Sequence, residues 1–438
     1  MFLNSLRHFS FWLLDTLKGG HVKKHYTEVT SILKAPNSKN AEAITSKHIG
    51  SLLKHATETT AFYKPYTGKT KIEDFPVIRK TVIQQNFEQF ESSIHRGKNN
   101  YKVSTSGSTG VPFFLFQNAQ KRHRNHADVM YYYNSCNFKI GNRLYELEVW
   151  RDHNKKGKLI SWLQNVCQFD ISRLTDNRIE TFLNLLKTDN QKGKTLLGFA
   201  SAFELIAQYL ERNNLNDHNL GINCIIANSE YLNAYTKNTL NKHLDIPVLS
   251  RYSSEEIGMI AQQTLSSTES FKVNHASYHL EILAMDSDNH VAPGEFGRIV
   301  VTDLFNYAMP IIRYDTGDIA RYKLDDDGVM EFDQIEGRKM DLIYDTKGNI
   351  ISSFVVYTKF YKYYKLLQQY QFIQQGQKSY EIKLNIHDDD FPFEKDLIAD
   401  IKSDFGDDAE ITLTYVDEIP PLSSGKRRKV VNNYKLLN

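Results

Sequence analysis

The fold is decided by residues 195–250, which begin with the apolar run Thr195-Leu196-Leu197-Gly198-Phe199. That run has the length and composition of a buried strand, and the same holds for residues 223–227 and 247–250. Two segments with helical spacing lie between the three runs. The first opens with a capping box of Ser201 and Glu204, and Asn228 or Ser229 is expected to cap the second. This alternation predicts parallel strands joined by helical crossovers.

The predicted parallel strands end in polar segments. In open sheets of this kind a ligand binds beyond the carboxyl ends of the strands. The second strand ends in Asn228-Ser229-Glu230, and the third in Arg251-Tyr252-Ser253-Ser254-Glu255-Glu256. We therefore expect the ligand site at these two segments.

The rest of the chain indicates further layers. Residues 41–62 and 80–94 have helical spacing, so the first hundred residues read as mostly helical. Residues 278–332 carry strand runs separated by turns, which indicates an antiparallel β subdomain. Beyond residue 337 the pattern alternates again. The predicted fold class is α/β: a large N-terminal domain with mixed or parallel sheets, helices and a β subdomain, followed by a small mobile α+β C-terminal domain.

A glycine- and hydroxyl-rich loop precedes the short apolar run 113–116. Its central residues are Ser104, Thr105, Ser106, Gly107, Ser108, Thr109 and Gly110. The two glycines allow a close approach to anionic oxygens, and the hydroxyls can donate hydrogen bonds to them. The spacing is not that of a Walker loop, because no lysine follows the second glycine. A nucleotide polyphosphate and an ordinary surface loop are both open at this point.

Composition narrows the class of protein. The 438 residues suggest two or three domains, and 41% hydrophobic with 24% charged residues is typical of a globular protein. A net charge of +2 favours no nucleic-acid partner. The three cysteines, Cys136, Cys167 and Cys224, form no C-x-x-C pair, which disfavours a zinc site or a disulfide framework. We expect a cytoplasmic protein.

The N-terminal segment leaves a membrane question open. No stretch approaches the roughly 20 apolar residues that span a bilayer. Phe2, Leu6, Phe9, Leu13 and Leu17 nevertheless recur at helical spacing near several basic residues. The alternatives are a helix docked on the protein body and a helix at the inner face of the membrane.

Four further segments follow the loop, and the order in which they occur is informative. They are Tyr252 to Glu256, Arg313-Tyr314-Asp315-Thr316-Gly317-Asp318, Gly337-Arg338-Lys339-Met340-Asp341 and Leu422-Ser423-Ser424-Gly425-Lys426. Together with Ile72-Glu73-Asp74-Phe75-Pro76-Val77, they resemble the adenylate-forming enzymes of the acyl-CoA synthetase and ligase superfamily. The branch that this chain resembles is the phenylacetate-CoA ligase group with its capsule-biosynthesis members. The resemblance covers nearly the whole chain. It implies a large domain over residues 1–336, a hinge at 337–341 and a small domain over 342–438.

The resemblance also implies cofactors and site residues. The loop from Ser104 to Gly110 would hold the β- and γ-phosphates of ATP, and Glu256 would help to hold Mg²⁺, which prefers carboxylate and phosphate oxygens. Asp318 would accept hydrogen bonds from the ribose hydroxyls. The residues implied on the adenine side and in the pocket wall are Ser229, Glu230, Tyr252 and Ser253.

Two cationic residues complete the implied site. Arg338 would reach the nucleotide near the hinge, and Lys426 would act as the catalytic lysine that bridges carboxylate and α-phosphate oxygens. Structural alternatives stand beside these roles: a solvated helix start for Glu255-Glu256, a β-turn aspartate for Asp318, and a basic surface tail or nucleic-acid patch for the run that begins at Lys426.

The sequence departs from the family pattern at Ser253, Glu255, Asp315 and Met340, of which Met340 occupies the usual hinge aspartate. The implied function is ATP-dependent activation of a carboxylic or amino acid to an acyl-adenylate with release of pyrophosphate. Transfer would follow to coenzyme A, to a carrier-protein thiol, or to an amine or hydroxyl of a sugar, with a role in capsule or envelope polysaccharide synthesis. The alternative is a catalytically degenerate nucleotide-binding or scaffolding protein of the same fold.

Overall fold

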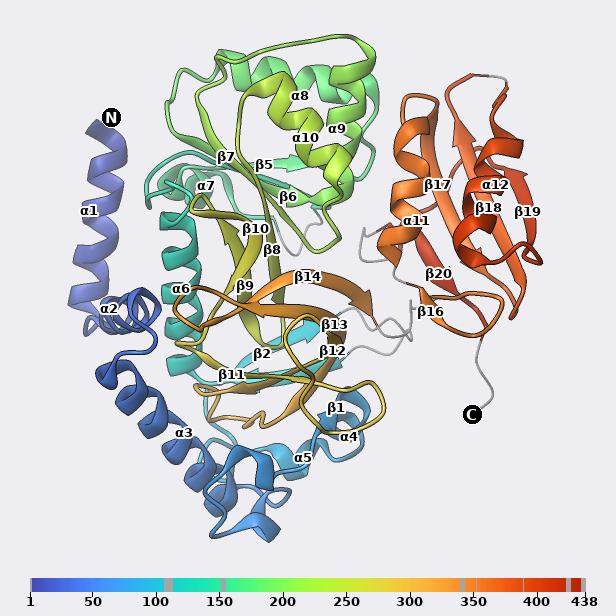
Figure 1. Cartoon of the computed structure of the whole chain (residues 1–438). Coiled ribbons are helices and arrows are strands. Elements are labelled where there is room, and N and C mark those ends of the chain that lie inside the picture. Colours follow the sequence, from blue (N-terminus) through green and yellow to red (C-terminus); the bar gives the residue numbers. More distant parts are fainter. Residues whose placement is uncertain are drawn as a thin grey trace. The chain divides into compact units, whose positions relative to one another are not determined.

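The computed structural model describes residues 2–105, 113–150, 155–338, 343–351, 353–388, 390–422 and 427–434 (Figure 1). Its contacts divide the chain into two compact units. Unit 1 contains residues 1–143, 158–166 and 249–335, and unit 2 contains residues 144–157, 167–248 and 336–438.

Unit 1 is built on an antiparallel β structure. In spatial order its strands are β11 (Tyr278–Leu283), β12 (Phe296–Asp303), β13 (Tyr314–Leu324), β14 (Met330–Arg338), β10 (Ser267–Val273), β9 (Gly258–Thr264) and β8 (Val248–Ser254). The short β1 (Ile78–Arg79) adds to β13 in parallel. The predicted antiparallel β subdomain is thereby confirmed, and it extends to β8, whose carboxyl end carries Tyr252.

Helices predominate in the first hundred residues, as predicted, and two further helices of unit 1 follow later in the chain. They are α1 (Phe2–Leu17), α2 (His21–Lys34), α3 (Lys39–Thr59), α4 (Lys80–Gln85), α5 (Phe87–Phe90), α6 (Ala119–Asn134) and α7 (Lys158–Gln164), with short 3₁₀ turns η1 (Lys64–Tyr66) and η2 (Ile72–Asp74). The core of the unit joins side chains from α3, the η2 segment and the sheet, among them Leu53, Phe75 and Ile299.

The glycine- and hydroxyl-rich loop joins two strands of a hairpin. Strand β2 (Tyr101–Thr105) pairs antiparallel with β3 (Phe113–Gln117), and Thr105 lies opposite Phe113. Phe113 and Leu115 belong to the core of unit 1. The two ends of the loop are therefore fixed by a hairpin whose second strand is anchored in the core.

Unit 2 contains two of the three predicted parallel strands, β6 (Lys194–Phe199) and β7 (Ile222–Asn228). The third, predicted over residues 247–250, is β8, which pairs antiparallel with β9 in unit 1. The strand order in unit 2 is β7, β6, β4 (Leu144–Glu148) and β5 (Val166–Asp170). The β4–β6 and β6–β7 pairs are parallel. Helices α8 (Asp176–Thr188), α9 (Ala200–Arg212) and α10 (Ala234–Leu244) pack on this sheet (Figure 1). Gly198 allows the close approach of β4, because a Cβ there would lie 2.6 Å from the Leu147 Cβ.

The predicted helix caps are wrong. Helix α9 begins after Phe199, and no side chain caps it in the way that Ser201 and Glu204 were expected to. The backbone N–H of Ser201 instead donates to the carboxylate of Glu230 from the following loop, at 2.9 Å. Helix α10 is capped by Asn233, whose side chain accepts from the Thr236 N–H at 2.8 Å. The loop between β7 and α10 is therefore longer than the sequence pattern indicated.

The last hundred residues form a second sheet within unit 2. Its strand order is β19 (Glu410–Tyr415), β18 (Ser379–Ile386), β17 (Leu367–Gln374) and β20 (Val430–Asn432). Helices α11 (Ser353–Phe360) and α12 (Glu394–Phe405), the turn η4 (Tyr361–Tyr363) and the small pair β15 (Ile343–Tyr344) and β16 (Ile350–Ile351) accompany it. This is the predicted small α+β region with its own apolar core.

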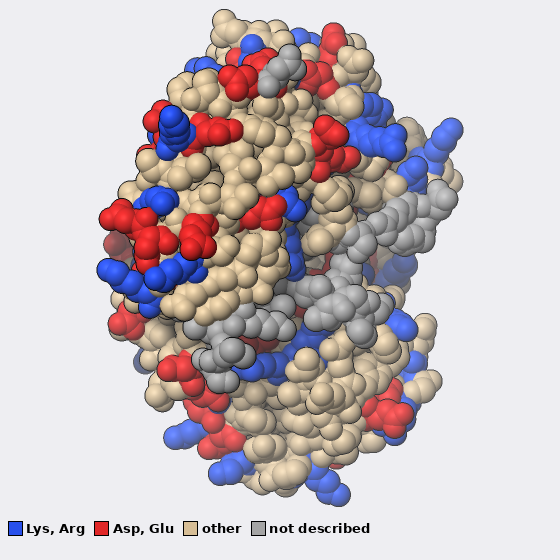
Figure 2. Space-filling model, turned by 90° about the vertical axis from the view of Figure 1, so that its right-hand side faces the viewer, with Lys and Arg blue, Asp and Glu red and all other residues tan. Residues whose placement is uncertain are grey.

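Charges of both signs lie side by side on the protein surface. Figure 2 shows basic and acidic side chains interspersed on the face that it presents, with neither sign covering it. This agrees with the small net charge of +2. No helix in the described ranges combines the length and the apolar character that a membrane span requires.

A buried arginine holds the N-terminal segment to the sheet of unit 1. Arg313, at a positive φ of 51°, donates to both carboxylate oxygens of Glu281 at 2.9 and 3.0 Å. Its third contact is a hydrogen bond of 3.0 Å to the Phe75 carbonyl. Both charged side chains are almost fully buried, with 6% and 1% of their surface exposed. The pair therefore links β13, β11 and the η2 segment.

We expect Arg313→Met to lower the free energy of unfolding by about 3–5 kcal/mol, because Glu281 then stays buried without its partner. Arg321→Met is the matched control: its 2.9 Å pair with Asp333 is partly exposed and should contribute about 1 kcal/mol or less. Urea unfolding of both variants measures the difference. Equal midpoints would contradict a central role for the Arg313 pair.

Candidate active site

Unit 1 brings Tyr252 and Asp318 into direct contact. The Tyr252 hydroxyl, at the end of β8, donates to Asp318 Oδ2 of β13 at 2.7 Å and lies 3.4 Å from Thr316 Oγ1. Burial and the nearby Asp318 charge raise the pKa of Tyr252 well above its ordinary value. The hydroxyl thus stays a neutral donor at physiological pH, and it fixes the orientation of a half-buried carboxylate.

Glu256 lies beside this pair, in the turn between β8 and β9. Tyr314 OH donates to Glu256 Oε1 at 3.4 Å. The side chain of Gln117, at the end of β3, donates to the Glu256 carbonyl at 3.3 Å. The segment is the turn of an antiparallel hairpin and not the start of a helix. Through Gln117 the turn is tied to the strand that follows the predicted phosphate loop.

A bulge in β13 turns the chain before Asp318, and Asp315 holds this turn. Gly317 has a φ of 80°, in the region that favours glycine, and its N–H donates to Asp315 Oδ1 at 3.0 Å. The other oxygen of Asp315 pairs with Arg298 at 2.7 Å, and both side chains are buried. Asp315 departs from the motif that the sequence resembles, and its contacts give it a structural task in presenting Asp318.

A single carboxylate such as Glu256 is compatible with Mg²⁺. Within the described residues no group of three His, Cys, Asp or Glu side chains is arranged to hold a metal ion. Mg²⁺ in nucleotide sites, however, needs only one or two carboxylates, because substrate phosphates and water supply the other ligands. Glu256, half-buried beside the end of β3, fits that requirement.

Several predicted site residues lie at the borders of the described ranges. Ser104 is exposed on β2, Thr105 ends that strand, and residues 106–110 lie outside the described residues. Ser253 is exposed on β8, and Arg338 is the last residue of β14. Met340 and Lys426 also lie outside the described residues. The structure therefore brings together Tyr252, Glu256 and Asp318 in unit 1.

Ser229 and Glu230 belong to unit 2, at the carboxyl end of β7. Ser229 is exposed and has a φ of 67°, which bends the chain sharply after the strand. The preceding Asn228 has a buried Oδ1 atom without a hydrogen-bond partner in the described structure. Such an orphaned acceptor calls for an explanation, and its place at a strand end is where ligands of parallel sheets bind.

Glu230 bridges two backbone segments. One carboxylate oxygen accepts from Ser201 N at 2.9 Å, at the start of α9, and the other accepts from Arg427 N at 2.7 Å. Burial outweighs these hydrogen bonds and raises the pKa of Glu230 above its ordinary value. Arg427 directly follows Lys426 in the sequence. Glu230 thus fixes the chain one residue after the predicted catalytic lysine.

Lys429 also holds the chain that follows Lys426, through contacts with α9 and with Tyr370. Its ammonium pairs with Glu204 Oε2 of α9 and lies 4.9 Å from the ring centroid of Tyr370. Asn233 Nδ2 donates to the same Glu204 oxygen at 3.2 Å. A small cavity of about 30 Å³ lies among these groups, with room for about one water molecule. The basic run after Lys426 is therefore partly buried against α9 and is not a free tail.

Sequence analysis missed the partners of the predicted residues. No pattern in the sequence pointed to a supporting role for Tyr314, Gln117, Arg298 or Arg427, because each acts through a contact between segments far apart in the chain. Glu204 was assigned to a helix cap, and Asn228 to another. The polar end of β7 was the one signal that pointed to Asn228 as a ligand residue.

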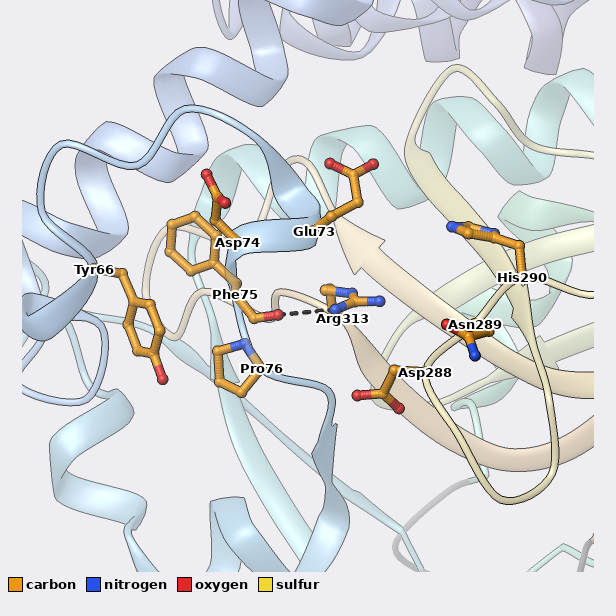
Figure 3. Close-up of a pocket in the computed structure, with 9 residues that line it drawn as sticks. All are labelled: Tyr66, Glu73, Asp74, Phe75, Pro76, Asp288, Asn289, His290 and Arg313. Carbon is orange, nitrogen blue, oxygen red and sulfur yellow. Dashed lines mark hydrogen bonds between the residues drawn. The ribbon is translucent and has the colours of Figure 1, made fainter.

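A pocket in unit 1 lies away from these residues. It has a volume of about 520 Å³, and Figure 3 shows Tyr66, Glu73 and Asp74 on one side of it with Asp288, Asn289 and His290 on the other. Arg313 lies between them and donates to the Phe75 carbonyl (Figure 3). None of the predicted site residues lines it. The site is therefore defined by the Tyr252, Glu256 and Asp318 cluster and not by pocket size.

Removal of the Glu230 carboxylate should loosen the chain after Lys426. We expect Glu230→Ala to speed trypsin cleavage at the basic run 426–429 by about tenfold or more, because two buried backbone N–H groups lose a charged acceptor. Glu418→Ala, at an exposed position nearby, is the control. Cleavage is followed by mass spectrometry of the released C-terminal peptide. Unchanged cleavage in Glu230→Ala would show that this contact does not hold the segment.

The sequence is similar to a known family model in its C-terminal part and to a known protein over most of its length. Residues 343–433 match the family model described as the CapK C-terminal domain. The chain is 23% identical over 377 residues to Protein CapK of Staphylococcus aureus, a match that covers 83% of this chain and 81% of that protein.

Solved structures give the fold. The structure is similar to that of a 2-hydroxyisobutyryl-CoA ligase in the postadenylation state in complex with R3-HIB-AMP. The TM-score is 0.71, the sequences are 15% identical, and 90% of each chain is covered. It is also similar to ATP-bound MatB from Rhodopseudomonas palustris, with a TM-score of 0.57, 14% identity, and 75% of this chain and 66% of that chain covered. The protein therefore has the fold of the adenylate-forming CoA ligases.

Proposed function

We propose that the protein activates a carboxylic or amino acid with ATP. A carboxylate oxygen attacks the α-phosphorus, the bond from that phosphorus to the bridging oxygen of the β-phosphate breaks, and pyrophosphate leaves. The product is an acyl-adenylate. The observation that carries the proposal is the contact of Tyr252 with Asp318 beside Glu256, next to the end of strand β3.

Two anions must meet in this reaction, so the site has to hold them in line and offset their repulsion. We assign the ribose hydroxyls to Asp318, whose carboxylate Tyr252 already orients. We assign the β- and γ-phosphates to the loop from Ser104 to Gly110, which β2 and β3 anchor at both ends. Lys426 and Arg338 supply the cationic groups near the α-phosphate, and Glu256 is the protein ligand of Mg²⁺, which would neutralise phosphate charge.

The adenine side is assigned to the end of β7. The orphaned Oδ1 of Asn228 can accept from an exocyclic amino group, and Ser229 turns the backbone beside it. Glu230 already accepts two backbone hydrogen bonds, so we assign it the holding of this loop and of the chain after Lys426. The base would then be recognised chiefly through Asn228 and the backbone.

Different comparisons support the proposed acceptor and the proposed setting. Coenzyme A is bound in a structure of 2-hydroxyisobutyryl-CoA ligase that has a TM-score of 0.57 to this chain. The likeness to Protein CapK and to its C-terminal domain supports a role in capsule or envelope polysaccharide synthesis. Within this proposal a sugar amine or hydroxyl, or a carrier-protein thiol, stands beside coenzyme A as the acceptor. The phenylacetate-CoA ligase branch remains part of the proposal, as does a place in the cytoplasm.

The domain division also remains a prediction. We propose a large domain over residues 1–336, a hinge at 337–341 and a small domain over 342–438 that turns after adenylation. The contacts in the structure group residues 336–438 with 144–157 and 167–248 instead of separating them as a third unit. The Glu230–Arg427 and Glu204–Lys429 contacts would have to break for such a turn.

Exchange of labelled pyrophosphate into ATP tests the function. We expect exchange with at least one acid from a panel of carboxylic and amino acids, and hydroxylamine should trap the adenylate as a hydroxamate. ATP binding by calorimetry without exchange for any acid would favour the degenerate nucleotide-binding alternative over the ligase.

Lys426→Ala should lower kcat for adenylation by about 100-fold or more while ATP affinity changes little, because the lysine acts on charge that develops as the carboxylate attacks. Lys378→Ala, an exposed lysine of the same sheet region, is the control. A synthetic adenylate given with the acceptor separates transfer from activation. Transfer should survive in Lys426→Ala, and full exchange activity in this variant would remove Lys426 from the site.

Asp318→Ala should weaken ATP binding by about tenfold, since the ribose hydroxyls lose an oriented acceptor. Tyr252→Phe should have a smaller effect in the same direction, because it removes only the group that orients the carboxylate. Asp333→Ala, at a partly exposed carboxylate of β14, is the control. Calorimetry compares ATP with a triphosphate that lacks the ribose. The same loss for both ligands would refute the ribose assignment.

A further inference from the structure

Exposed apolar side chains gather on two elements of unit 1 that are far apart in the sequence. On α1 they include Phe2 at 83% exposure, Leu6, Phe9 at 63%, Leu13 and Leu17 at 74%. On α7 they are Leu159 at 69%, Ile160, Trp162 at 58% and Leu163. We call these side chains the apolar face. Singly exposed apolar residues need no explanation, but a contiguous group of this size indicates an interaction surface.

Helix α1 presents its apolar stripe outward. At about 100° per residue, Phe2, Leu6, Phe9, Leu13 and Leu17 fall within an arc of about 80°. The buried Asp15 lies on the opposite side of the helix. Amphipathic helices of globular proteins normally turn the apolar side to the core, and α1 does the reverse. Figure 1 shows α1 (blue) at the outer edge, with no described element on its far side.

Polar contacts keep α1 in this orientation. Asp15 accepts from the N–H groups of Val22 and Lys23 at 3.0 and 2.9 Å and so caps α2. Near the other end, a Cβ on Gly141 would lie 2.3 Å from the Asn4 carbonyl oxygen, so the backbone of α1 lies directly on this glycine. These contacts join both ends of the helix to the body, and rolling the apolar stripe inward would break them.

Helix α7 continues the same surface. Arg7 of α1 donates to the Trp162 carbonyl at 2.9 Å, and its guanidinium lies 5.4 Å from the centroid of the Trp162 ring. The two helices therefore meet at Arg7 and Trp162, and Arg7 lies one turn after the exposed Leu3 of α1. Tryptophan with an arginine beside it is typical of side chains placed at the boundary of lipid and water.

The charged residues on and next to the two helices are basic, with one exception. Arg7 belongs to α1, Lys18 follows it, Lys23 and Lys24 lie in the first turn of α2, and Lys158 begins α7. The one acidic residue among residues 1–24 is Asp15, which is buried. A second protein chain would need no such bias, whereas an anionic lipid surface attracts basic groups that flank an apolar helix.

We propose that α1 and α7 together bind an anionic lipid bilayer, with α1 lying in the plane of the interface. At 1.5 Å per residue α1 extends over about 24 Å, and its stripe can enter the boundary between headgroups and acyl chains along that length. The inference does not depend on the proposed activity. It identifies the partner as lipid of negative charge, and it adds α7 to the surface that the N-terminal sequence alone indicated.

Vesicle flotation with the full chain tests the proposal. The vesicles contain phosphatidylglycerol and phosphatidylcholine in one set and phosphatidylcholine alone in the other. We expect binding to the anionic set that falls as salt is raised. Leu6→Glu/Leu13→Glu should lower the partition coefficient by about tenfold or more, since two charges enter the stripe. Leu324→Glu, at an equally exposed leucine of β13, should change it little.

Trp162 supplies an independent measurement. The chain has three tryptophans, so Trp12→Phe/Trp150→Phe leaves Trp162 as the one fluorophore of this type. Its emission should shift to shorter wavelength when anionic vesicles are added, because the ring leaves water. Absence of both flotation and the shift would overturn the proposal. A lipid-free dimer in analytical ultracentrifugation that Leu6→Glu/Leu13→Glu dissociates would overturn it as well, because a second copy would then cover the face.

Discussion

The ion pair of Arg313 with Glu281 is the contact on which the architecture of unit 1 depends. It places a guanidinium where β13 begins, binds it to β11, and uses its remaining donor to hold the Phe75 carbonyl. A buried charge pair is worth little to stability by itself, but it is costly to break, so it fixes which segments meet. The residues that follow Arg313 form the turn that presents Asp318. The same pair thus ties the N-terminal segment to the strand that bears the candidate ribose-binding carboxylate.

Much of the fold could be predicted from periodicity. The parallel strands 195–199 and 223–227 and the antiparallel run after residue 278 stand in the structure within a few residues of their expected bounds. These strands are buried on at least one face, and burial imposes a composition that the sequence shows directly. The caps of α9 and α10 could not be predicted in this way. The N–H of Ser201 is satisfied by Glu230, 29 residues away in the chain, and a local pattern such as S-x-x-E carries no information on so distant a competitor.

The candidate site shows the same difference between residues that a local pattern reveals and residues that act through long-range contacts. Tyr252, Glu256 and Asp318 were found from motifs, because a motif preserves residue types at a fixed spacing. Their supports were not found: Tyr314 contacts Glu256, and Arg298 neutralises Asp315, only because the sheet brings β12, β13 and the β8–β9 turn together. In the sequence alone, the departure of Asp315 from the family motif suggested a loss of catalytic activity. In the structure the same carboxylate caps Gly317 and pairs with a buried arginine, so the residue stabilises the turn on which Asp318 depends.

Helix α1 is stabilised differently from the helices that bury an apolar side against the core. A free helix of 16 residues is marginal in water, so its stability must come from contacts. Those contacts lie on one side of the helix: Asp15 accepts from α2, the backbone at Asn4 lies on Gly141, and Trp12 packs on Tyr26, while the apolar stripe stays exposed. Burial of the stripe against lipid would supply the missing apolar energy without repacking the body. The structure therefore separates two tasks: polar groups dock α1 on unit 1 in a fixed orientation, and that orientation keeps the apolar face available together with Trp162 of α7.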